Sequence, residues 1–178
     1  MDTFWENNDE LFLSIMSVLA EYSNELAEHY KQRLEAGGKR ASGKLIDTIK
    51  PFVKRSTWGW DAGITVQDYW KYVEKGLKGR GNSRKNSDSP FPVPRSRGAI
   101  AYWLEKNGWL EAKGLPRESK WAIATTIWNE GIKKGNQFEE ANQAVNAMYL
   151  PKVQEAINED FQRVEYKVWS DITKMIKV

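Results

Sequence analysis

The 178-residue sequence contains no cysteine and a single histidine, His29. Disulfides and thiolate metal sites are therefore excluded, and the chain lacks the ligands of a His/Cys metal cluster. No apolar run approaches the roughly 18 residues of a membrane-spanning helix, and the start MDTFWENNDELF lacks the basic segment of a signal peptide. Paired-carboxylate motifs and a G-x-S-x-G elbow are also missing. We therefore expect a protein that is not an enzyme, binds no cofactor and enters no membrane.

Aromatic residues, in contrast, are plentiful: the chain has nine Trp and seven Tyr. Trp is amphipathic and enriched at interfaces, so some of these side chains are expected to face partners while most belong to the core. The length is that of one domain with a core of its own, and we predict a single domain over residues 1–178 with an extended basic loop at about 77–96.

Charge is distributed unevenly along the chain, although the net charge is only +3. Residues 1–36 hold eight acidic and two basic side chains, a net charge of −6. Residues 75–97 hold seven basic side chains and one acidic, a net charge of +6. This layout favours head-to-tail association between copies as well as contact with nucleic acid.

The basic loop, KGLKGRGNSRKNSDSPFPVPRSR, is the most informative segment. Loops longer than about 12–15 residues in compact domains are usually functional or disordered. After Leu77, Phe91 and Val93 are nearly its only apolar residues, so it cannot bury a face of its own. We interpret it as a surface that grips a partner. The candidate partner-binding residues are Tyr69, Trp70, Glu74, Lys78, Arg80, Arg84, Lys85, Arg95 and Arg97.

Nucleic acid is the alternative partner. The Gly-Arg-Gly and Ser-Arg-Lys segments can wrap phosphates, and the flanking aromatic residues can stack on bases. Those aromatic residues are Trp70, Tyr72, Tyr102 and Trp103. A run of charge is more often a solvated loop, however, and aromatic residues at helical spacing are more often core.

Apolar residues of the N-terminal region recur at helical spacing: Leu11, Ile15, Val18, Tyr22, Leu26 and Tyr30. Asp9 is a candidate N-cap, and Gly37-Gly38 ends the helix. A helix of this length, about 42 Å, either wraps its own core or packs partly on another chain.

The middle of the chain is expected to hold a short helix, capped by Ser42, running through Ile49 and ended by Pro51, and then two strands. The strands are 51–58 and 60–70, with a turn near Trp58-Gly59. The segment 69–76, YWKYVEKG, is compatible with either a strand or a short helical turn, and the sequence does not distinguish the two. Within it, Glu74 either pairs with a basic residue that fixes the end of the sheet or is a surface glutamate.

Three helices are expected after the loop. The first spans Arg97–Asn107 and is closed by Gly108, and the second starts near Leu115. The second places Trp121, Ala124, Thr125 and Trp128 on one face. The third spans about 138–177, with a kink or break at Pro151. The predicted fold class is α+β: a long N-terminal helix, a small antiparallel sheet of short strands, several C-terminal helices and a long basic loop.

Three segments in order resemble a family of phage proteins. Residues 39–50, KRASGKLIDTIK, are similar to its G-[KR]-L-x-x-S-I segment, with Thr48 in place of Ser. Residues 69–76 are similar to its Y-x-x-[YF]-[VL]-E-x-G segment, which leads into a loop rich in Gly, Lys and Pro. Residues 100–131 resemble a variant with a Trp-Leu helix followed by I-A-x-x-I-W-x-E-G. The family is that of the tail-completion and head–tail connector (neck) proteins of long-tailed bacteriophages. The usual Pro-Phe after the loop is replaced by Pro90-Phe91-Pro92.

The resemblance covers roughly residues 25–135 and implies a structural virion protein that forms a ring at the neck or tail. Its implied partners are copies of itself and the connector and tail-tube proteins, with DNA passing through the channel as a further contact. The implied location is the virion, with the host cytoplasm during assembly. Extended, the 18 residues from Lys78 to Arg95 would span up to about 60 Å, enough to reach an adjacent subunit.

Overall fold

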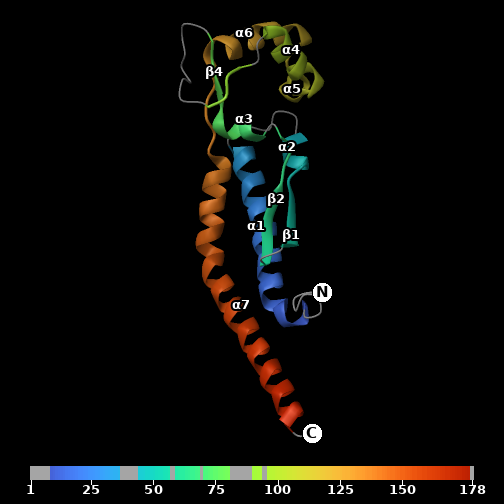
Figure 1. Ribbon diagram of the computed structural model, residues 1–178. Helices are drawn as coiled ribbons and strands as arrows, with labels where there is room; N and C mark the ends of the chain where they lie inside the picture. Colours follow the sequence, from blue (N-terminus) through green and yellow to red (C-terminus); the bar gives the residue numbers. More distant parts are fainter. Residues whose placement is uncertain are drawn as a thin grey trace. The chain divides into compact units, whose positions relative to one another are not determined.

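The computed structural model describes residues 9–36, 44–56, 59–68, 70–80, 90–93 and 96–176 (Figure 1). The fold is α+β with helices predominating, as the sequence predicts. The chain divides into two compact units. The first comprises residues 1–27, 51–64 and 143–178, and the second comprises residues 28–50 and 65–142. In the described part of the chain no helix is both long and apolar enough to cross a membrane.

The predicted N-terminal helix is confirmed. A 3₁₀ turn at Asp9–Phe12 leads into α1, Leu13–Ala36, while the expected terminator Gly37-Gly38 lies outside the described residues. Leu11, Leu26 and Tyr30 of the predicted stripe are buried, together with Ser23, Ala27 and Leu34. Ile15, Val18 and Tyr22 of the stripe are half-buried, so other parts of the same chain cover the stripe only in part.

In the first unit α1 packs along α7, Gln137–Ile176 (Figure 1). The α7 residues Val145, Tyr149 and Ala156 are buried at spacings of four and seven, which places them on one helical face. The rings of Tyr22 and Tyr149 meet edge to face with centroids 6.0 Å apart. The Tyr22 hydroxyl donates to Asn146 Oδ1, and burial raises the pKa of Tyr22 above its ordinary value.

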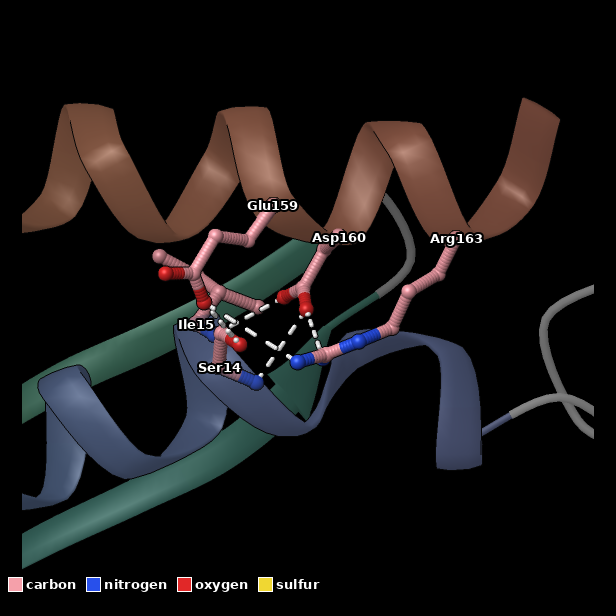
Figure 2. A network of polar contacts seen from close by, with 5 residues as sticks. All are labelled: Ser14, Ile15, Glu159, Asp160 and Arg163. Atoms are coloured by element: carbon pink, nitrogen blue, oxygen red, sulfur yellow. Dashed lines mark hydrogen bonds and ion pairs between the residues drawn. The ribbon is translucent and has the colours of Figure 1, made fainter. Parts of the chain in front are cut away.

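Asp160 of α7 joins the two helices through backbone hydrogen bonds (Figure 2). The residue is 3% exposed, and its carboxylate accepts the N–H groups of Ser14 at 3.1 Å and Ile15 at 2.8 Å. These N–H groups belong to the first turn of α1, where no earlier carbonyl of the helix is available to accept them. Arg163 donates to the same carboxylate at 2.6 Å. Asp160 thus takes the place of an N-cap side chain for α1, although it belongs to another helix.

The predicted pair of strands is confirmed as a two-stranded sheet of β1, Lys50–Ser56, and β2, Gly59–Thr65. Hydrogen bonds link Ser56 to Gly59 at one end and Thr65 to Lys50 at the other, so the strands run antiparallel. The preceding helix, α2, spans only Lys44–Asp47. The prediction that it reaches Ile49 is wrong, because residues 48 and 49 make a turn and residue 50 already belongs to β1.

Proline does not break the C-terminal helix. Pro151 lies inside α7, which is continuous through Ile176. The missing N–H removes one hydrogen bond, but the turns on both sides of Pro151 are held by the buried residues Tyr149 and Ala156.

The second unit is built mainly of short helices. They are α3, Trp70–Lys75; α4, Arg97–Lys106; α5, Trp109–Ala112; and α6, Lys120–Glu130, which follows a 3₁₀ turn at Arg117–Ser119. Ser96 is the N-cap of α4, since its hydroxyl accepts the Ala99 N–H. The helix ends before Gly108, which has a φ of 65°. A cluster of buried apolar residues in the second unit comprises Leu77, Val93, Ile100, Ala101, Leu104 and Ala124. For residues 69–76, where the sequence allows either a strand or a helical turn, the structure has the helix α3 at Trp70–Lys75.

A second sheet was not anticipated from the sequence. β3, Leu77–Lys78, pairs antiparallel with β4, Gly131–Ile132. The register places Leu77 opposite Ile132 and Lys78 opposite Gly131. This ladder of two residues per strand joins the start of the basic loop to the end of α6.

Replacement of Asp160 by Ala is expected to lower the free energy of unfolding by about 2–3 kcal/mol, because two partly buried N–H groups lose their charged acceptor. Glu159→Ala is the control, since Glu159 is exposed, accepts the Ser14 hydroxyl and forms a 3.9 Å ion pair with Arg163. Chemical denaturation followed by circular dichroism measures both. Equal effects of the two substitutions would contradict the role given to Asp160.

Candidate interaction site at the base of the basic loop

The basic loop is closed at its base by backbone hydrogen bonds. The N–H of Lys78 donates to the Phe91 carbonyl at 2.6 Å, and the N–H of Val93 donates to the Lys78 carbonyl at 3.1 Å. Val93 is 1% exposed and belongs to the core, while the Phe91 ring meets Tyr72 edge to face at 5.3 Å. The two apolar residues that the sequence places in the loop are its anchors.

This closure corrects the reach expected for the loop. Because Lys78 is bonded to residues 91 and 93, the chain must leave and return to the same point. The span of about 60 Å expected from Lys78 to Arg95 is therefore wrong, since Val93 lies beside Lys78. Residues 81–89 lie outside the described residues.

Glycines allow the base to form. A Cβ at Gly79 would overlap the carbonyl oxygen of Asn129, and one at Gly131 would overlap that of Leu77. Gly131 also has a φ of 81°, which side chains disfavour. The start of the loop thus lies directly against the end of α6, with backbone touching backbone.

Glu74 fixes the segment just before the loop. Its side chain is 5% exposed, and its carboxylate accepts the Tyr30 hydroxyl at 3.1 Å. The same carboxylate accepts the N–H groups of Asn136 at 3.1 Å and Phe138 at 3.0 Å, at the start of α7. The Glu74 carbonyl also accepts the Gly135 N–H. Glu74 therefore caps α7 in the way that Asp160 caps α1.

Both expectations for Glu74, pairing with a basic residue and exposure at the surface, are wrong. The carboxylate is neither at the surface nor paired with a basic side chain in the described part of the chain, because backbone N–H groups and a hydroxyl satisfy it. Trp70 takes part in the same cluster, since the Phe138 ring lies between the rings of Tyr30 and Trp70. The centroid distances are 5.4 and 5.8 Å.

A shallow open groove lies beside the base of the loop, with a volume of about 620 Å³. Residues from the start of α4 and from α6 line it: Ser96, Arg97, Gly98, Trp121, Thr125 and Trp128. Arg80 adjoins it, with its N–H bonded to the Trp128 carbonyl and its guanidinium 5.4 Å from the centre of the Trp128 ring. Trp121 is 54% exposed. We refer to these residues together with Arg80 as the loop-base groove.

The electrostatics of the groove are cationic. Glu105, the acidic residue of α4, is engaged by Arg117 and Lys120. Within the described part of the chain no acidic side chain pairs with Arg80 or Arg97, and both are exposed. Two guanidinium groups beside indole rings suit a ligand that combines negative charge with an apolar or planar group. The described residues contain no group of three or more acidic or histidine side chains that could hold a metal ion.

The structure brings together part of the predicted site. Lys78, Arg80 and Arg97 are exposed at the base of the loop, whereas Trp70 and Glu74 serve the internal cluster. Tyr69, Arg84, Lys85 and Arg95 lie outside the described residues, as does Ser42. Trp121 and Trp128 were predicted to share a helix face but not to join the site. Their signal was present in the sequence as two Trp residues one heptad apart on a helix that follows the loop.

Comparison with known proteins found no matching family model, curated protein or solved structure.

Replacement of Glu74 by Ala is expected to lower the free energy of unfolding by about 2–4 kcal/mol, because the partly buried N–H groups at the start of α7 and the Tyr30 hydroxyl lose a charged acceptor. Glu139→Ala, in the exposed first turn of the same helix, is the matched control and should change it by less than about 1 kcal/mol. Denaturant unfolding measures both. A Glu74→Ala variant as stable as the wild type would contradict the capping role.

Replacement of Gly79 by Ala is expected to destabilise the protein by about 1–3 kcal/mol, because the new methyl group meets backbone that cannot move aside. Gly98→Ala is the control and should have the opposite effect on the free energy of unfolding, since this position has free space for a methyl group and lies within α4. It should stabilise by up to about 1 kcal/mol. Thermal unfolding of the two variants checks the close packing of the loop base.

Proposed function

We propose that the protein is a structural subunit that assembles head to tail into a ring, with the loop-base groove and the basic loop as one half of the contact. The observation that carries this proposal is the pair of exposed arginines, Arg80 and Arg97, beside the indole rings of the groove. Backbone hydrogen bonds from Lys78 to Phe91 and from Arg80 to Trp128 join the base of the loop to this groove, so the two offer one surface to a neighbouring subunit.

The chain supplies an acidic surface for the other half of the contact. Residues 1–36 carry a net charge of −6, and Glu21, Glu28 and Glu35 of α1 are exposed. The basic segment 75–97 carries a net charge of +6. Contact between different surfaces of identical chains is heterologous, and it closes into a ring when the rotation between neighbours allows. Opposite charges of this size also accelerate and orient the encounter.

The resemblance of residues 39–50, 69–76 and 100–131 to neck and tail-completion proteins supplies the biological setting. In that setting the protein is a virion component of a long-tailed phage and joins the head or its connector to the tail. The connector and tail-tube proteins are then its other partners, and DNA passes through the ring.

Replacement of Arg80 and Arg97 by Ser tests the proposed contact. The double variant should raise the dissociation constant for assembly at least tenfold, a change of about 1.4 kcal/mol. It should change folding stability by less than about 1 kcal/mol, because both side chains are exposed. Lys54→Ser/Lys106→Ser removes the same charge from exposed positions elsewhere and is the control. Sedimentation velocity and negative-stain imaging measure assembly.

Two outcomes would overturn the proposal. One is normal assembly by the Arg80→Ser/Arg97→Ser variant. The other is a wild-type monomer that binds single-stranded DNA with a steep salt dependence that the substitutions reduce, because this behaviour identifies a nucleic-acid-binding module. The exposed Trp121 beside Arg97 is the feature that such a module would use for stacking.

A further inference from the structure

The C-terminal part of α7 has a second apolar face. Five exposed residues define it, at spacings of seven, four, seven and seven: Leu150, Ile157, Phe161, Val168 and Met175. Phe161 is 69% exposed and Met175 is 71% exposed. Val164 and Ile172, which are half-buried, continue the same face between them. We call this face the α7 stripe.

The stripe is distinct from the face that packs on α1. At 3.6 residues per turn it lies about 100° around the helix from Tyr149, Ala156 and Asp160. Hydrogen bonds from Ser14 and Ile15 to Asp160 set the rotation of α7 about its own axis (Figure 2). Because that rotation is fixed, the stripe is held away from α1. In Figure 1 the red end of α7 also runs past the start of α1, shown in blue.

The size of the stripe is that of an interface. From residue 150 to residue 175 it is about 37 Å long. Its five side chains present on the order of 100 Å² each, since aromatic side chains bury 150–250 Å² when fully covered. Two such stripes in contact would remove on the order of 1,000 Å² from water, near the lower bound for a specific protein–protein interface. Monomeric proteins rarely leave an apolar patch of this kind uncovered.

The pattern and charge of the stripe fit a second copy of the same helix. Apolar residues at spacings of three, four and seven form the seam of a coiled coil, which needs a partner helix with the same repeat. Residues 150–176 hold four basic and five acidic side chains, so two copies meet with a net charge of only −1 each. Like-charge repulsion between the copies is therefore small.

We propose that the α7 stripe is a self-association surface that packs against the α7 stripe of a second copy of the chain. This contact is isologous, because both copies use the same surface. It is separate from the heterologous contact of the loop-base groove and does not depend on it. A protein with both contacts can pair subunits across a two-fold axis as well as join them around a ring.

Glutamate substitutions test the stripe. Phe161→Glu/Val168→Glu should raise the dissociation constant of the dimer at least 100-fold. Tyr166→Glu/Thr173→Glu introduces the same charges, also seven residues apart, on the opposite side of α7 and should leave it within threefold. Each of the two variants is made both in the wild-type chain and in a chain that carries Arg80→Ser/Arg97→Ser. Comparison of the two backgrounds separates loss of the ring contact from loss of the α7 contact. Circular dichroism confirms that the variants remain helical.

Cross-linking gives a second readout that does not rely on a disruptive substitution. Because the chain has no cysteine, any disulfide formed by a single-cysteine variant joins two chains. Val164→Cys should cross-link under mild oxidation, and Tyr166→Cys should not, since a disulfide needs Cα atoms within about 7 Å. A wild-type monomer at about 100 µM would exclude a dimer of micromolar affinity and overturn the proposal. That result would assign the stripe to another protein or to residues 1–8 of the same chain. Equal cross-linking at both positions would also overturn it.

Discussion

The long helices of this protein depend on buried carboxylates that accept backbone N–H groups at their first turns. Asp160 does this for α1, and Glu74 does it for α7. Each carboxylate comes from a distant part of the sequence, so each cap is also a tertiary contact that fixes the position and rotation of the helix. A charged acceptor is favourable at this end because the N–H groups there are unpaired and the helix dipole is positive. Without these two contacts the helices would have apolar faces but no fixed register.

The surfaces proposed for assembly follow from this constraint. Asp160 sets the rotation of α7 and so determines that Leu150, Ile157 and Phe161 face away from α1. Glu74 lies between Tyr30 and the start of α7, three residues before Leu77. It therefore anchors the chain where β3 begins and where the basic loop is closed by Lys78. The α7 stripe and the loop-base groove respond differently to salt. Salt screens the charged contacts of the groove and leaves the apolar contacts of the stripe largely intact.

Local patterns predicted the helices well, because the spacing of Leu11 to Tyr30, the helix end at Gly108 and the strands around residues 58–59 depend on near neighbours. The groove was predicted in part: the cationic residues stood out, but the role of Trp121 and Trp128 depends on α6 packing against α4. Glu74 illustrates the limit most clearly. Its partners lie 44 to 64 residues away, and nothing in a single sequence distinguishes a carboxylate that caps a remote helix from one that is exposed. The β3–β4 ladder was missed because two residues per strand carry no detectable alternation.

The central claim is that the chain is an assembly subunit with one electrostatic and one apolar contact. Sedimentation velocity of the wild-type protein at about 100 µM, across a series of salt concentrations, tests it most directly. The account predicts discrete rings at low ionic strength that separate into dimers as salt rises, because the contact of the loop-base groove is screened while the α7 contact persists. A chain that stays monomeric at every salt concentration would contradict it.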